Sequence, residues 1–190
     1  GETFANVRVP FIPDAQISPN RTVGLVLTNP QPANVAQLGL QPQATLVIVN
    51  DNCAVRFSDA AYSRNENAPD GRATIALVRD GSLLNAVSAN FATTTNGTAR
   101  PGIDFTMVNQ TVTFLPGQTN QNVFVPIFNG QVINGHKTVL MQLANASGPG
   151  ATLGSPSQAT LTIINDIRIP QPTNNAFLNA RGISGSWGTT

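Results

Sequence analysis

One stretch of the sequence occurs twice, and this repeat limits what the chain can fold into. Residues 6–30 align with residues 122–146 at an offset of 116, and 9 of these 25 positions are identical. After a one-residue deletion, residues 37–51 align with residues 152–166 at an offset of 115, with 9 of 15 positions identical. A repeat of this length exceeds a solenoid unit and matches one small domain, so the sequence predicts modules in tandem.

The repeat divides the chain into three parts. A module that ends near Asp166 with this period begins near Cys53, so we expect one complete module over residues 53–167. Residues 1–52 are then the second half of another module, either cut from a longer protein or completed by a partner. Residues 168–190 form a tail that does not restart the pattern. Its Pro, Asn, Gly and Ser content favours a flexible linker, whereas Trp187 favours a strand that docks on a neighbour.

Apolar residues alternate with polar ones along most of the chain, which is the period of a β-strand with one buried face. Three such strands are expected in the first part, around Val7–Phe11, Val23–Leu27 and Ala44–Ile48. The dipeptide Asn96-Gly97 is predicted to form a turn, because both residues tolerate positive φ. About seven short strands in the complete module predict an all-β fold, an immunoglobulin-like antiparallel β-sandwich. We expect its core to include three phenylalanines: Phe91, Phe105 and Phe114.

The composition excludes several classes of function. Charged residues make up only 10% of the chain and the net charge is +1, which gives no field for nucleic acid or an anionic membrane. Cys53 is the only cysteine, so no disulfide forms within the chain. No apolar run approaches the length of a membrane span. Low charge with uncharged polar residues is typical of extracellular and cell-surface proteins, and we expect that location.

The order of motifs in the complete module resembles the Calx-beta family. The module contains Tyr62-x-x-x-Glu66, and it ends on the run Ala159–Asp166. The most specific part is the segment Asn96–Phe105, which reads NGTARPGIDF and is followed by the run Thr111–Gly117. The resemblance covers residues 53–167 and, as a half module, residues 1–52. It implies a seven-stranded β-sandwich with calcium-binding loops at one end.

The resemblance also implies where calcium ligands would lie. Glu66 matches the glutamate that follows the tyrosine, Asp104 matches the aspartate before the aromatic residue, and Asp166 matches the cluster that closes the last strand. The acidic run that the family carries before the sixth strand is absent, since residues 129–135 contain no carboxylate. Calcium takes six to eight oxygen ligands with several carboxylates. We therefore expect no cofactor, and keep a weak, degenerate calcium site at these three residues as an alternative.

Nothing in the sequence supplies a catalytic set. His136 is the only histidine, it lies in a Gly-His-Lys loop, and no nucleophile motif accompanies it. We expect a non-catalytic structural or adhesive module of an extracellular protein, and not an enzyme. The alternative is a calcium-responsive binding module. A third hypothesis concerns assembly: residues 1–52 would expose sheet edges that strands from another chain or subunit complete, with the 168–190 tail as a candidate donor and a filament as one outcome.

Overall fold

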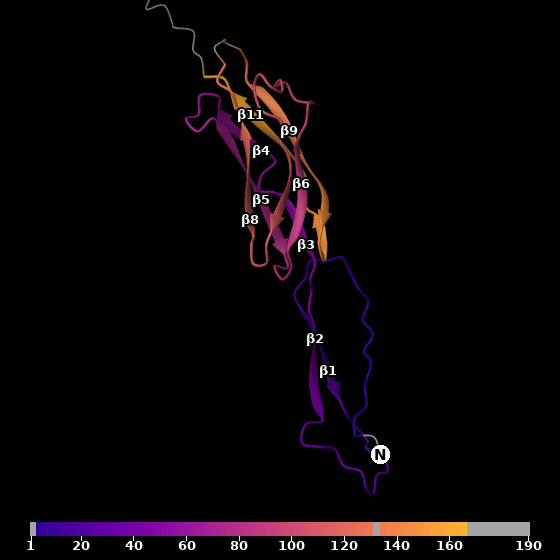
Figure 1. The fold of residues 1–190 in the computed structure, drawn as a ribbon. Coiled ribbons are helices and arrows are strands. Elements are labelled where there is room, and N and C mark those ends of the chain that lie inside the picture. Colours follow the sequence, from indigo (N-terminus) through magenta and orange to yellow (C-terminus); the bar gives the residue numbers. More distant parts are fainter. Residues whose placement is uncertain (1–2, 131–133, 167–190) are drawn as a thin grey trace, which may run out of the picture.

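The computed structural model describes residues 3–130 and 134–166, and these residues form strands and loops without a helix (Figure 1). No segment among them is therefore a helix able to cross a membrane. The predicted tail, residues 168–190, lies outside the described residues. The eleven strands are β1 (Arg21–Val26), β2 (Gln43–Ile48), β3 (Cys53–Phe57), β4 (Ala61–Asn65), β5 (Arg72–Gly81), β6 (Val87–Thr93), β7 (Asn109–Phe114), β8 (Asn120–Pro126), β9 (Lys137–Ser147), β10 (Ala151–Leu153) and β11 (Gln158–Ile164).

Strands β3 to β11 form two sheets that face each other. One sheet has the order β10-β3-β5-β8 and the other has the order β4-β11-β9-β6-β7. The predicted all-β sandwich is therefore confirmed. Two edge pairs are parallel, β3 with β10 and β4 with β11, while the rest are antiparallel. The chain crosses from one sheet to the other between Phe57 and Ala61. After the crossing, β4 lies at the edge of the five-stranded sheet, whereas β3 lies between β5 and the short edge strand β10.

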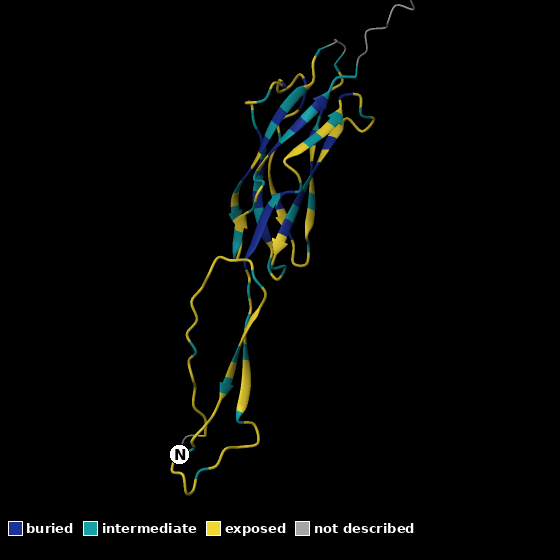
Figure 2. Ribbon diagram, turned by 180° about the vertical axis from the view of Figure 1, so that it is seen from behind, coloured by how far each residue is buried: buried dark blue, intermediate teal, exposed yellow. Residues whose placement is uncertain are grey.

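The core lies between these two sheets and follows the alternation of the sequence. Every second residue of β5 and β6 is buried, and Figure 2 shows the buried positions gathered inside the sandwich. Phe57 and Phe91 meet edge to face, with ring centroids 6.0 Å apart. Phe105 comes from the loop after β6 and is also fully buried. The prediction that Phe91, Phe105 and Phe114 are core residues is confirmed.

Strands β1 and β2 repeat the pairing of β9 and β11 residue for residue. Val23 pairs with Leu46, and their counterparts Val139 and Leu161 pair in the same way. The two non-glycine residues with positive φ in the described chain, Asn29 and Asn145, are also counterparts at the offset of 116. The repeat seen in the sequence is therefore a repeat of backbone geometry and strand register.

The first copy contains two strands where three were expected, and the predicted strand at Val7–Phe11 is wrong. Its counterpart β8 pairs only with β5, within the complete copy. The first copy has no equivalent of β5 among the described residues, so residues 7–11 have no neighbouring strand to which they can hydrogen bond. Alternating apolar and polar residues give a segment one apolar face, but a β-strand also requires a neighbouring strand that forms backbone hydrogen bonds with it.

Asn96-Gly97 forms a bend in a long connection rather than the tight turn of a hairpin. The chain bends there, but neither residue has positive φ, and β6 and β7 are joined by the long segment 94–108. A Cβ atom on Gly97 would lie 2.0 Å from the carbonyl oxygen of Thr138. Glycine is needed at this position because another backbone passes against it, rather than for its freedom in φ.

Candidate functional site

Several polar and charged side chains lie close together at the ends of three neighbouring strands, β4, β11 and β9. Glu66 follows β4, Lys137 begins β9, and Asn165 follows β11. Because Ile163 pairs with Lys137 and Ile164 pairs with Asn65, these positions are adjacent at one end of the five-stranded sheet. Asp104 joins them from the segment after β6. We define the end cluster as Glu66, Asp104, Asn134, Lys137 and Asn165.

A buried ion pair forms the centre of the end cluster. The Lys137 Nζ atom donates a hydrogen bond to Asp104 Oδ1 at 2.5 Å. The side chains are 16% and 8% exposed, so water screens this pair far less than it screens a surface pair. The other oxygen, Asp104 Oδ2, accepts from the backbone N–H of Arg100 at 2.7 Å. Both oxygens of the carboxylate are therefore occupied by nitrogen donors of the chain itself.

These donors set the ionisation of Asp104. Burial alone would raise the pKa of this carboxyl, because it disfavours the charged form. The hydrogen bond and charge of Lys137, together with the Arg100 hydrogen bonds, act in the opposite direction and hold the pKa below its ordinary value of 3.8. Asp104 is therefore ionised at neutral pH, and its negative charge is balanced locally by the ammonium group.

The second buried carboxylate, Glu66, is 4% exposed and contacts an amide rather than a cation. Asn165 Nδ2 donates to Glu66 Oε1 at 2.8 Å, and it also donates to Asn134 Oδ1 at 3.1 Å. With the Asn134 amide turned over, its oxygen instead accepts from Lys137 Nζ at 3.1 Å. The two asparagines thus lie between the carboxylate of Glu66 and the ion pair.

The third candidate ligand, Asp166, is engaged at the edge of this end. Its Oδ2 atom accepts a hydrogen bond from Asn67 Nδ2. His136 is exposed, and its Nδ1 atom accepts the backbone N–H of Asn165 at 3.2 Å. In this contact His136 holds the end of β11 in place.

The donor set at this end of the sandwich differs from that of a calcium site. A calcium site needs several carboxylate oxygens that converge on one point. Over residues 3–130 and 134–166, no three His, Cys, Asp or Glu side chains are grouped so that they could hold a metal ion. The ammonium of Lys137 also lies against Asp104, where a cation would bind. The arrangement does not fit calcium as it stands, although a weak site at Glu66, Asp104 and Asp166 stays a prediction.

Sequence reasoning did not identify Lys137, which is the residue that most determines the chemistry of this end. A signal was present, because the counterpart of Lys137 in the first copy is Arg21, another cation. Arg21 lies 3.0 Å from Asp14, so this position carries an ion pair in both copies. A basic residue at the same strand position in both copies predicts a side-chain cation that pairs with a carboxylate in each copy.

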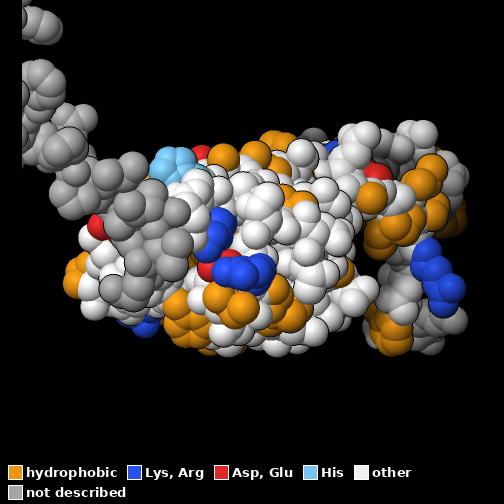
Figure 3. All heavy atoms as spheres, turned by 90° about the horizontal axis from the view of Figure 1, so that it is seen from above, with side chains coloured by type: hydrophobic (Ala, Val, Ile, Leu, Met, Phe, Trp, Pro, Cys, Tyr) orange, Lys and Arg blue, Asp and Glu red, His pale blue; other side chains and the backbone are white. Residues whose placement is uncertain are grey.

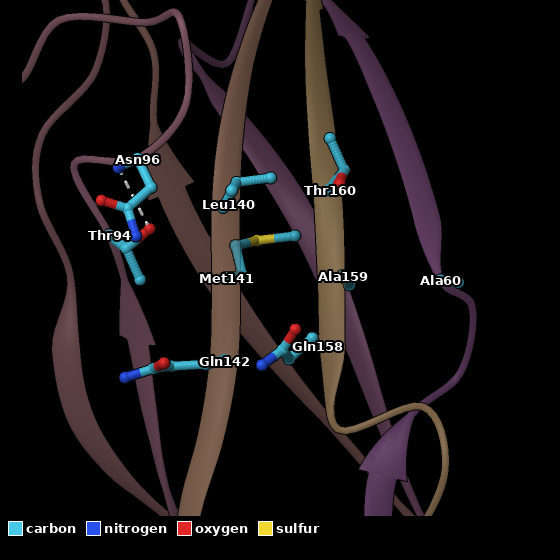
Figure 4. Close-up of a pocket in the computed structure, with 9 residues that line it drawn as sticks. All are labelled: Ala60, Thr94, Asn96, Leu140, Met141, Gln142, Gln158, Ala159 and Thr160. Carbon is cyan, nitrogen blue, oxygen red and sulfur yellow. Dashed lines mark hydrogen bonds between the residues drawn. The ribbon is translucent and has the colours of Figure 1, made fainter.

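A shallow hollow on the outer face of β9 and β11 offers no second site (Figure 4). None of its nine lining residues is acidic, basic or histidine. Its polar lining comes from Thr94, Asn96, Gln142, Gln158 and Thr160. The space-filling view shows Lys and Arg side chains beside Asp and Glu side chains near the middle of the visible face, among mostly uncharged surface (Figure 3). General acid–base chemistry needs a positioned titratable group, and this hollow supplies none.

Comparison with known families gives one match that covers most of the chain. The family model described as the Calx-beta domain matches residues 1–52 and, separately, residues 49–167.

Among curated proteins, the chain is similar to sodium/calcium exchanger 1 of Felis catus, with 34% identity over 139 residues. This match covers 64% of the chain and 14% of the exchanger. The chain is also similar to the extracellular matrix organizing protein FRAS1 of Mus musculus, with 29% identity over 171 residues, 86% of the chain and 4% of that protein. The chain thus spans a small fraction of these relatives.

Among solved structures, the apo form of the Calx CBD1 domain is similar to the chain, with a TM-score of 0.57 and 27% identity. The match covers 61% of the chain and 99% of that domain. The Calx CBD2 domain gives a TM-score of 0.54 at 12% identity, with coverage of 60% of the chain and 86% of that domain, which shows the shared fold alone.

Proposed function

The chain belongs to the Calx-beta domain family, and we propose that it is a non-catalytic structural module of an extracellular or cell-surface protein, which spaces or joins other parts through Calx-beta units in tandem. The similarity to FRAS1, whose name describes the organisation of extracellular matrix, supports this location. A spacer needs a defined junction between consecutive units more than it needs a binding site.

The junction between the first copy and the sandwich is the observation that carries this proposal. Asn52 is 9% exposed, and its Nδ2 atom donates to the backbone oxygens of Asp14 and Gln16, at 2.9 and 3.1 Å. On the sandwich side, the N–H of Ser82 donates to the Asn52 backbone oxygen at 3.0 Å. Asn52 therefore bridges the two parts. A buried amide nitrogen that donates two hydrogen bonds across the junction favours a fixed orientation over a free hinge.

Close packing at Gly81 supports the same conclusion. Gly81 has a φ of 90°, which favours glycine, and a Cβ atom there would lie 2.9 Å from Cγ2 of Ile17 in the first copy. The first copy thus approaches the last residue of β5 closely. This contact and the bonds of Asn52 would together restrict bending at the junction.

The proposed rigidity can be measured by ¹⁵N relaxation. In the unaltered chain we expect amides near Asn50 to share the rotational correlation time of the sandwich. Asn52→Ala removes the bridge and should free the first copy, so that its amides tumble faster. Asn120→Ala is the matched control, because the Asn120 side chain bonds only its neighbour Thr119 and is exposed. Independent tumbling of the two parts in the unaltered chain would refute the spacer proposal.

A calcium-responsive binding module is the second candidate function. Two observations favour it: Glu66 and Asp104 are both buried carboxylates at one end of the sandwich, and the relatives include sodium/calcium exchanger 1. Against it stands the Lys137 ammonium on Asp104. An ammonium and a calcium ion would compete for the same carboxylate, so calcium would have to displace a buried, hydrogen-bonded cation.

Titration with calcium separates the two candidates. In the unaltered chain we expect no binding heat and no change in melting temperature at several millimolar calcium. Lys137→Asp replaces the cation by a third carboxylate, and this variant should gain a calcium-dependent rise in melting temperature. Lys137→Met is the matched control, because it removes the charge without adding a ligand. Calcium binding by the unaltered chain would favour the calcium-responsive function.

A further inference from the structure

The side chain of Asn134 lies between two nitrogen donors, and an amide can satisfy only one of them. Asn165 Nδ2 lies 3.1 Å from one terminal atom of the Asn134 side chain, and Lys137 Nζ lies 3.1 Å from the other. An amide has one oxygen that accepts hydrogen bonds, whereas its nitrogen only donates. In either orientation of the amide, the nitrogen of Asn134 therefore faces another nitrogen donor.

The neighbours of Asn134 cannot exchange their roles to relieve this mismatch. Asn165 Nδ2 also donates to Glu66 Oε1 at 2.8 Å, so turning the Asn165 amide over would place its oxygen against the Glu66 carboxylate. Lys137 has no acceptor atom and can only donate. Because both neighbours stay donors, a carboxylate with two accepting oxygens matches this position, whereas an amide does not.

The glycine that follows Asn134 allows the amide to be converted into such a carboxylate. Gly135 is exposed, and nothing lies within 4 Å of a Cβ atom placed on it, so its backbone can turn toward the Asn134 side chain. The same rotation moves the Gly135 carbonyl oxygen, which lies 3.2 Å from the terminal atom of Asn134 that faces Asn165. Asn96-Gly97 is the same dipeptide in closely packed surroundings, because its glycine lies against the Thr138 backbone.

We propose that Asn134-Gly135 is a site of spontaneous deamidation, and that the aspartate it produces is the form of residue 134 that fits the end cluster. The main-chain nitrogen of Gly135 attacks Cγ of Asn134 and gives up its proton. The new Cγ–N bond closes a cyclic imide while the Cγ–Nδ2 bond breaks. Nδ2 takes up the proton and leaves as ammonia.

Water completes the conversion by opening the imide. Its hydroxyl group adds to a ring carbonyl carbon, the bond from that carbon to nitrogen breaks, and the remaining proton goes to the Gly135 nitrogen. Opening at Cγ gives aspartate, whereas opening at the main-chain carbonyl carbon gives isoaspartate. Only aspartate leaves the main chain unaltered and places both carboxylate oxygens between Lys137 and Asn165.

The end cluster assists the first step of this reaction. With the Asn134 amide turned over, Lys137 Nζ donates to its oxygen at 3.1 Å. Negative charge develops on this oxygen as the Gly135 nitrogen attacks, and a fixed ammonium group beside it stabilises that charge. The attacking nitrogen also belongs to the next residue of the chain, so the two reacting groups are already held close together.

The product stabilises the ends of two strands. Lys137 begins β9 and Asn165 follows β11, so a carboxylate at residue 134 contacts donors from both. Lys137 would then lie between two carboxylates, that of Asp104 and that of residue 134. Deamidation therefore replaces a contact between two nitrogens by a charge-assisted hydrogen bond.

Mass spectrometry of the full chain tests the reaction. The protein is incubated at neutral pH and digested, and the peptides that carry Asn134 and Asn96 report two Asn-Gly sites of one molecule. We expect Asn134 to convert about 10-fold faster or more, because Gly135 can turn into the attacking geometry and Gly97 is held by packing. Equal conversion at the two sites would overturn the proposal, and so would isoaspartate as the only product at residue 134.

Lys137→Met tests the assistance by the ammonium group. Circular dichroism first establishes that the variant keeps its fold. Conversion at Asn134 should then slow by about 3-fold or more, while conversion at Asn96 should stay the same. An unchanged or faster rate at Asn134 would contradict the role assigned to Lys137.

Asn134→Asp tests the fit of the product without waiting for the reaction. This variant should raise the melting temperature by about 2–6 °C through the new charge-assisted hydrogen bond. Asn129→Asp is the matched control, because it adds the same charge at an exposed asparagine of the same loop and should change the melting temperature little. The gain from Asn134→Asp should shrink when Lys137→Met is also present. A lower melting temperature in Asn134→Asp, or an equal gain without Lys137, would overturn the claim that this position fits a carboxylate.

Discussion

Removing the same leucine from each copy should have very different effects on stability. Leu161 is fully buried in the sandwich, and Leu161→Ala should lower the free energy of unfolding by about 2–5 kcal/mol through lost burial and the cavity left behind. Its counterpart Leu46 sits at the same register, opposite Val23, but remains half-buried. Leu46→Ala should lower the free energy of unfolding by less than about 1 kcal/mol, because folding removes less of the Leu46 side chain from water.

Urea unfolding followed by circular dichroism measures this difference. A loss of about 3 kcal/mol at a slope of about 1.5 kcal/mol/M lowers the midpoint by about 2 M, whereas Leu46→Ala should shift it by less than about 0.5 M. Leu84→Ala is a control for the substitution itself, because Leu84 is 59% exposed. Equal losses at Leu46 and Leu161 would refute the claim that only one copy has a closed core.

Three further changes probe individual contacts. The folded pKa of Asp104 is lowered, so the stability that its ionised carboxylate contributes is present above the unfolded pKa and is lost as pH falls through the folded pKa. Thermal unfolding between about pH 5 and pH 2 should therefore show a loss of stability, and Asp104→Asn should make this loss smaller. An identical pH profile in the variant would contradict this cause. Gly97→Ala places a Cβ atom 2.0 Å from the Thr138 backbone oxygen, so it should lower the free energy of unfolding in urea by at least about 1–3 kcal/mol. Gly135→Ala is the control and should change this free energy little, because nothing lies within 4 Å of its Cβ position. Tyr62→Phe removes the hydroxyl that donates to the Ala76 oxygen at 2.8 Å and should cost about 1 kcal/mol in urea unfolding, and an unchanged midpoint would show that this bond adds nothing.

The architecture was largely predictable from local pattern. Alternation with a period of two identifies most strands of the sandwich, because strands such as β5 and β6 bury every second residue. The repeat identifies β1 and β2 as relatives of β9 and β11. The exception was Val7–Phe11, where the pattern is intact and the strand is missing. The alternation of apolar and polar residues shows which face of a strand is apolar. Strand pairing also requires a second segment that hydrogen bonds to the first, and the repeat in the sequence does not show whether that segment is present. The short strand β10 was also missed, because three residues carry too little periodicity.

The end cluster was predictable in part. Glu66 and Asp104 were chosen as carboxylates and do lie at one end of the sandwich as buried acids. Lys137 is not predictable from a ligand pattern, because a cation that takes the place of a metal is not itself a metal ligand. Its long side chain reaches Asp104, which is 33 positions away in sequence. Such a contact follows from the folded arrangement of the strands, and only the basic residue Arg21 at the equivalent position hinted at it.

Native-state hydrogen exchange in the unaltered chain tests most directly whether one copy is closed and the other open. The amides of Val23 and Leu46 should be compared with those of Val139 and Leu161, because the two sets share one register and hence the same local hydrogen-bonding pattern. The account predicts that the first pair exchanges by local opening, faster by about 100-fold or more, while the second exchanges only through global unfolding. Equal exchange rates at the two pairs would contradict it.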